Sequence, residues 1–66
     1  MEITFNLEVH AKQFYQYVSD RFMSTRLTLT SNVVKTTEIG EDLKRELHEL
    51  AEYFAGPWNY KVSDGL

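Results

Sequence analysis

The chain has 66 residues, no cysteine, and a formal net charge of −3 from ten acidic and seven basic side chains. The length fits one domain near the lower limit for independent folding, and the lack of cysteine excludes disulfides and thiolate metal sites. An acidic chain without an apolar run of about 20 residues is not expected to bind nucleic acid directly or to enter a membrane. We therefore expect a cytoplasmic protein.

The first third of the chain predicts a strand followed by a helix. Polar and apolar side chains alternate over residues 2–9, which is typical of a half-buried strand whose inward set is Ile3, Phe5, Leu7 and Val9. The period then changes to three and four residues, which predicts a helix over residues 10–23. The apolar stripe of this helix is Ala11, Phe14, Tyr15, Val18 and Phe22.

The middle of the chain fits a hairpin. Residues 26–30 return to a period of two, and only Ser31 and Asn32 separate them from the segment 33–37, which suits a two-residue loop. Such a loop would place Thr30 opposite Val33 and Leu29 opposite Val34. An alternative interpretation is one long bent strand over residues 26–37, which would leave the C-terminal segment as an arm that offers Trp58 and Tyr60 to a partner.

The last third predicts a second helix and a final strand. The helix has an apolar stripe, carries acids in its first turn, and ends at Gly56-Pro57. Its stripe is Ile39, Leu43, Leu47, Leu50, Ala51 and Phe54. Beyond it, Trp58, Tyr60 and Val62 would point inward from a strand over residues 58–62, and residues 63–66 are expected to fray.

The order strand, helix, strand, strand, helix, strand resembles the ferredoxin-like split βαβ arrangement. The resemblance implies a compact α+β domain over residues 1–66, with two helices on one face of a four-stranded antiparallel sheet. The edges of that sheet would be residues 26–30 and 58–62. RNA-binding proteins with this strand order stack bases on aromatic side chains of the open face, whereas the outward positions here carry no aromatic residue.

No group of residues predicts catalysis, a metal site or a cofactor site. His48 begins a segment similar to the zinc-protease helix motif, but the position of the second histidine is Glu52. His10 has no identifiable partner, and the glycines are isolated. We therefore expect a protein that is not an enzyme and that holds neither a metal nor a cofactor.

The acidic side chains gather on the second helix. Between Glu38 and Glu52 six acids and two bases give a charge of −4, and the rest of the chain carries +1. This surface is either an ordinary solvated helix face or a binding surface for a basic site on another macromolecule. The second hypothesis assigns partner binding to Glu46, Glu49, Glu52, Tyr53 and Tyr17.

The combined features favour a small acidic protein-binding module. In size and acidity the chain resembles the small inhibitors of phages and mobile elements, which include anti-CRISPR proteins and DNA mimics. That resemblance implies a protein or a protein–nucleic acid complex as partner. The alternative is a homodimeric regulatory or small-ligand-sensing domain that associates through an edge strand.

Overall fold

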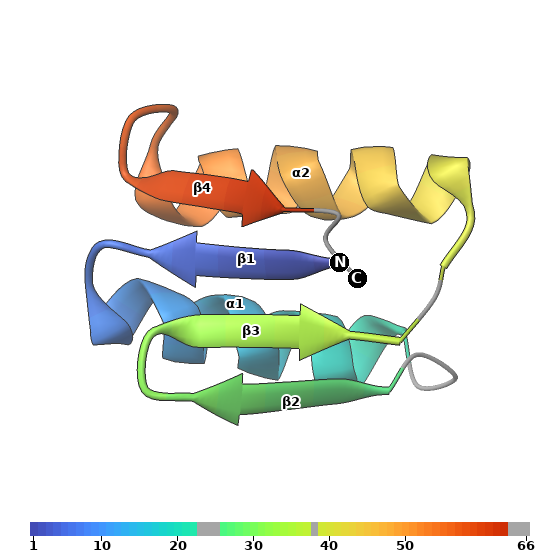
Figure 1. Cartoon of the computed structure of the whole chain (residues 1–66), viewed down its shortest axis with the longest axis horizontal. Helices are drawn as coiled ribbons and strands as arrows, with labels where there is room; N and C mark the ends of the chain where they lie inside the picture. The colour runs from blue at the N-terminus through green and yellow to red at the C-terminus, as the bar shows by residue number, and fades with distance from the viewer. Residues whose placement is uncertain (23–25, 38, 64–66) are drawn as a thin grey trace.

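The computed structural model describes residues 1–22, 26–37 and 39–63. Its elements are β1 (Glu2–Phe5), α1 (Glu8–Arg21), β2 (Leu27–Thr30), β3 (Val33–Thr36), α2 (Glu41–Ala55) and β4 (Tyr60–Ser63). The strands form one antiparallel sheet in the order β2-β3-β1-β4, and both helices cover the same face of it (Figure 1). The predicted ferredoxin-like α+β architecture is confirmed, with β2 and β4 at the edges.

The β2–β3 hairpin has the predicted two-residue loop. Thr30 lies opposite Val33 and Leu29 opposite Val34, so the predicted register is confirmed. Ser31 adopts a positive φ of 57°, which the tight turn requires and which serine can reach without a glycine. The alternative interpretation of residues 26–37 as one bent strand is wrong, because the chain reverses at this turn.

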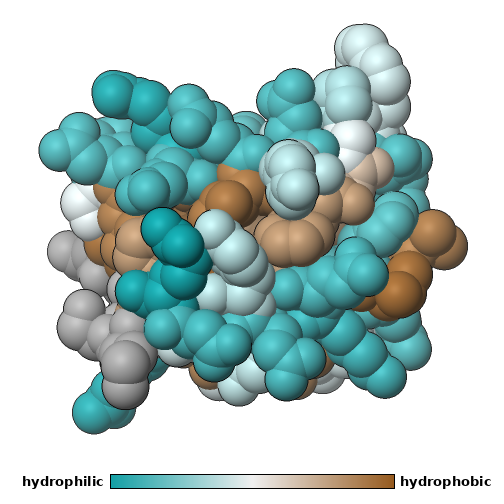
Figure 2. Space-filling model, turned by 180° about the vertical axis from the view of Figure 1, so that it is seen from behind, coloured by the Kyte–Doolittle hydropathy of each residue, from teal (hydrophilic) through white to brown (hydrophobic). Residues whose placement is uncertain are grey.

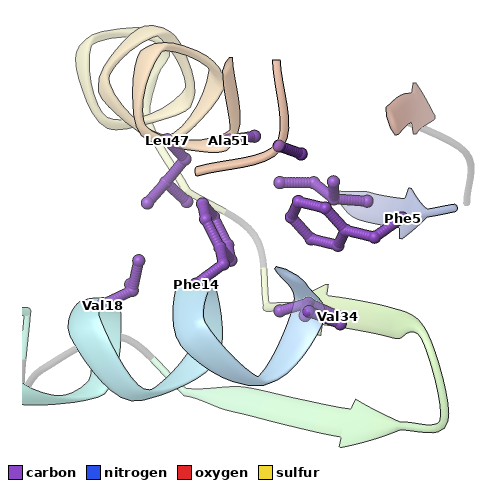
Figure 3. Packing of buried hydrophobic residues seen from close by; sticks show 9 residues of the cluster. Phe5, Phe14, Val18, Val34, Leu47 and Ala51 are labelled. Carbon is purple, nitrogen blue, oxygen red and sulfur yellow. The ribbon is translucent and has the colours of Figure 1, made fainter. Parts of the chain in front are cut away.

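The core lies between the sheet and the two helices (Figure 3). Phe5 from β1, Phe14 from α1 and Leu47 from α2 are fully buried, and the rings of Phe5 and Phe14 have centroids 5.3 Å apart. The other buried members are Ile3, Ala11, Val18, Val34, Ala51 and Ala55. Both helices are therefore held to the sheet by one apolar cluster, as the two stripes predicted.

The first strand is shorter than the alternation of residues 2–9 predicted. It ends at Phe5, and Leu7 and Val9, predicted to point inward, are 54% and 53% exposed. The amide of Asn6 donates to the carbonyl of Asn59, and beyond this point neither neighbouring strand continues. A longer strand would leave its backbone groups unpaired, so the chain begins α1 instead, at Glu8 rather than at residue 10.

The prediction for Trp58 is also wrong. This side chain is 89% exposed, because it lies in the turn before β4 and not in the sheet. Asn59 holds that turn, since its Nδ2 donates to the carbonyl of Ala55 at 2.7 Å. Tyr60 and Val62 are partly buried against the core, as predicted. Of the segment predicted to fray, Ser63 belongs to β4, and residues 64–66 lie outside the described residues.

The predicted end of α2 is confirmed. Gly56 is the C-terminal cap, with φ 89°, and its amide donates to the carbonyl of Glu52 at 2.8 Å. An added Cβ would lie 3.4 Å from Nδ2 of Asn59, the atom that holds the following turn. Backbone conformation and local contact therefore both favour glycine at this position.

Replacing Gly56 with alanine is expected to lower the free energy of unfolding by about 1 kcal/mol, because alanine is strained at positive φ. Gly40→Ser is the matched control at the other end of α2. Gly40 has φ −76°, and beyond its chain neighbours no atom of the described residues lies within 4 Å of an added Cβ; serine is also a good N-cap. Urea denaturation should show a loss for Gly56→Ala and no loss for Gly40→Ser. Equal stability of Gly56→Ala and the wild type would contradict this role of Gly56.

Candidate functional site

Helix α2 turns its leucine stripe toward the sheet and its acidic side outward. Leu47, Ala51 and Ala55 are buried, and the four residues predicted on this helix for partner binding are exposed, with Tyr53 80% exposed. These four are Glu46, Glu49, Glu52 and Tyr53. The strong separation of the two sides explains why this helix could be oriented from its sequence.

A groove between the two helices brings most of these residues together. Its volume is about 370 Å³, and we call it the interhelical groove. Its walls are Tyr17 from α1 and Glu46, Glu49, Leu50 and Tyr53 from α2. Figure 2 views the helical side of the molecule and shows hydrophobic surface between the helices, bordered by hydrophilic surface. The groove therefore combines an apolar floor, two phenol rings and two carboxylates.

The aromatic rings of the groove are held by one another. Phe54 makes edge-to-face contacts with Tyr17, at a centroid distance of 5.4 Å, and with Tyr53, at 5.2 Å. Such contacts restrict both tyrosine rings, so a partner has less side-chain freedom to remove on binding. The guanidinium carbon of Arg21 lies 5.3 Å from the centroid of the Tyr17 ring. This ring therefore already accepts a cation on its face.

The carboxylates beside the groove are not neutralised by the nearest arginine. Arg45 stands one and four positions from Glu46 and Glu49 along α2, yet the described residues include no ion pair between Arg45 and either of them. The ion pair seen in the described part of the chain joins Lys35 to Glu2 at 3.4 Å, on the open face of the sheet. A cation from outside can therefore approach both groove carboxylates without displacing a bridge.

Glu52 does not line the groove. Together with partial burial of the ring, the negative charge of Glu52 instead raises the pKa of Tyr60 in β4. The Tyr60 ring contacts the His48 ring edge-on at a centroid distance of 5.9 Å. The Tyr60 hydroxyl donates to the carbonyl of His48 at 3.3 Å. Of the five residues predicted for partner binding, the structure thus groups Tyr17, Glu46, Glu49 and Tyr53 and leaves Glu52 outside the group.

Tyr60 is expected to titrate above its ordinary pKa of 10.0. Partial burial raises the pKa of the Tyr60 phenol, and the negative charge of Glu52 raises it further. Because the folded state holds this proton more tightly than the unfolded state, the resulting stability is present below the unfolded pKa and is lost as pH rises through the folded pKa. Glu52→Gln should lower the pKa of Tyr60, as followed by the Tyr60 Cζ chemical shift, and Glu49→Gln is the control. An unchanged titration in Glu52→Gln would contradict the assignment.

The two histidines show no arrangement for metal binding. No group of three or more His, Asp, Glu or Cys side chains that could hold a metal ion occurs among the described residues. His48 contacts Tyr60, as described, and Nδ1 of His10 is buried without a hydrogen-bond partner in the described structure. A second hollow, of about 290 Å³, mixes acidic and basic side chains and so lacks the single sign of charge of the interhelical groove. Its walls are Met1, Glu41, Lys44, Arg45, His48 and Val62.

Comparison with known proteins adds no assignment. No family model, curated protein or solved structure matches this chain. Within the described residues, no helix has the length and apolar character needed to cross a membrane. The arrangement of side chains in the groove is therefore the basis for a functional proposal.

Sequence reasoning missed three residues of this site. Leu50 and Phe54 pack against the core, as the predicted stripe requires, but their second roles were missed: Leu50 also lines the groove, and Phe54 contacts the rings of both tyrosines. Arg21 was not singled out, although its position four residues after Tyr17 places the two on the same side of α1. That spacing was the available signal for the arginine. No sequence signal distinguished the edge of the leucine stripe from its centre.

Proposed function

We propose that this protein is a non-catalytic binding module whose interhelical groove occupies a basic site on a protein or on a protein–nucleic acid complex. The observation that carries the proposal is that residues from two helices, far apart in sequence, line one groove with two phenol rings and two carboxylates. A solvated helix face needs charged side chains, but it needs no tyrosines positioned by a third ring.

The chemistry of the groove fits the side chain of arginine better than that of lysine. The N–H groups along the edge of a guanidinium can donate to the carboxylates of Glu46 and Glu49, while its planar face rests on the ring of Tyr53 or Tyr17. Within the chain itself, the guanidinium of Arg21 already makes a cation–π contact with the Tyr17 ring. Leu50 supplies apolar surface for the aliphatic part of the incoming side chain.

A protein of this kind acts by blocking the basic site that it covers. This is the mode of the phage and mobile-element inhibitors that the sequence resembles, of the anti-CRISPR or DNA-mimic type. The acidic groove supports that mode, because a site evolved for phosphates presents arginines and lysines that carboxylates can pair with. A cytoplasmic location belongs to the same proposal.

The proposal is tested by titrating the isotope-labelled protein with a hexa-arginine peptide and recording amide chemical shifts. We expect the largest changes at Tyr17, Leu50 and Tyr53, and about threefold weaker binding of hexa-lysine, because a stacked guanidinium gains about 0.5–1 kcal/mol. Tyr53→Ala should remove this preference for arginine. Thr4→Ala, on the open face of the sheet, is the control and should leave it unchanged.

The contrary result is a response spread over all acidic side chains, with equal affinity for the two peptides. Such a response would show general attraction between opposite charges and no specific groove. Largest shifts at Glu41 and His48 would instead place binding in the second hollow and would also contradict the proposal.

A further inference from the structure

The outer edge of β2 is the least protected part of the sheet. β2 pairs with β3 on one side, and its other side has no strand partner among the described residues. Its sequence is Leu-Thr-Leu-Thr, without charge or proline, and its register with β3 contains no bulge. The opposite edge strand, β4, carries Lys61 in its middle and follows Pro57 closely. Charged side chains and proline usually prevent another strand from pairing with an exposed sheet edge, and β2 has neither.

The backbone groups of this edge point outward from alternate residues. In an antiparallel ladder, successive residues direct their N–H and C=O to opposite sides. The carbonyl of Arg26 accepts a hydrogen bond from the amide of Thr37, on the side of β3. Thr28 and Thr30 are two and four residues further along, so their N–H and C=O groups also point toward β3. The N–H and C=O groups of Leu27 and Leu29 therefore face away from the sheet.

The core-facing side chains of β2 are incompletely covered. Leu27 and Leu29 point to the side of the helices but are only partly buried, whereas Val34 and Ile3 on the next two strands are fully buried. The apolar layer is thus fully buried at β1 and β3 but partly exposed to solvent at β2. Another strand at this edge would complete the burial of both leucines.

We propose that a second copy of this chain pairs with β2 in antiparallel orientation, giving one continuous sheet with all helices on the same face. A two-fold axis through Thr28 places Leu27 opposite Leu29 of the second copy, and these residues exchange hydrogen bonds in both directions. The two Thr28 side chains then face each other on the open side, and Thr–Thr is a favourable cross-strand pair.

The alternative axis through Leu29 fails on geometry. It would pair Leu27 with Ser31 of the second copy, and Ser31 has left the strand with φ 57°. The axis through Thr28 instead sets Arg26 opposite Thr30 of the second copy and keeps all paired residues within β2 and its first flanking residue.

Pairing through β2 is independent of the proposed partner-binding function, because it uses the edge of the sheet and none of the groove residues. The paired segment is short, so the interface is small and the dimer weak. A buried area well below about 1,000 Å² belongs to the weak, transient class of interface. The dimer should therefore be seen in concentration series and not at low micromolar concentration.

Sedimentation of the whole chain over a concentration series is the test. The average mass is expected to rise from the monomer value of 7.8 kDa toward twice that value. Thr28→Lys should weaken association at least tenfold, because it sets two like charges face to face at the axis. Val33→Lys, one strand further in on the same open face, is the matched control and should leave association unchanged.

A contact between the two copies gives a second, independent readout. A sample that mixes labelled and unlabelled chains should also show a contact between the α-protons of Thr28 in the two copies. A monomer at every concentration, or a dimer that Lys61→Glu weakens and Thr28→Lys does not, would overturn the proposal.

Discussion

Replacing Phe14 with alanine is expected to leave the chain largely unfolded at 25 °C. Phe14 is fully buried where α1 meets the sheet, with its ring against that of Phe5. Removing such a ring from a core costs about 3–5 kcal/mol. A single core in a chain of this size rarely supplies more than about 3–5 kcal/mol of net stability. The loss is therefore comparable with the whole free energy of unfolding.

Circular dichroism during urea denaturation checks this expectation, with Val9→Ala as the control. Val9 lies on the same helix but is 53% exposed, so its removal should change the free energy of unfolding by less than about 0.5 kcal/mol. A cooperative transition in Phe14→Ala with a loss below about 1 kcal/mol would show that the core does not depend on this ring.

Reversing the two groove carboxylates should abolish partner binding. Glu46→Lys with Glu49→Lys would set ammonium groups against a basic site, and such like-charge contacts cost several kcal/mol. We therefore expect at least about a 100-fold loss of affinity, which corresponds to about 2.8 kcal/mol. The measurement compares the protein retained from a lysate of the source cell by each immobilised variant.

The control for this prediction has the same net charge. Each Glu→Lys change adds +2, so two changes take −3 to +1 in the groove variant and also in Glu2→Lys with Glu8→Lys. Those two control positions lie in β1 and in the first turn of α1, away from the groove. Retention by the control and not by the groove variant is the expected pattern. Equal retention by both variants would mean that the groove does not bind the partner.

The fold followed from the sequence because periodicity and turn chemistry agreed over most of the chain. The two residues between Thr30 and Val33 fixed the register of the hairpin, and Gly56 fixed the end of α2. The errors lie where hydrophobic alternation continued past the paired region. Leu7, Val9 and Trp58 fit a period of two, but the neighbouring strands end before they can pair there. Strand length thus depends on partners that are distant in sequence.

The candidate site followed only in part. Charge and spacing on α2 identified Glu46, Glu49 and Tyr53, because a helix displays one face to solvent in a regular way. That Tyr17 would meet these residues depended on how α1 packs beside α2. The roles of Phe54 and Arg21 depend on ring orientation, which no spacing in the sequence specifies.

Photo-crosslinking can locate the surface of this protein that lies against a bound partner. Benzoylphenylalanine is placed at Tyr53 in the groove and, as a control, at Lys61 on the open face of the sheet, and each variant is irradiated with the protein captured from the source cell. We expect an adduct from position 53, attached beside an arginine or lysine of the partner, and none from position 61. An adduct from position 61 without one from position 53 would contradict binding through the interhelical groove.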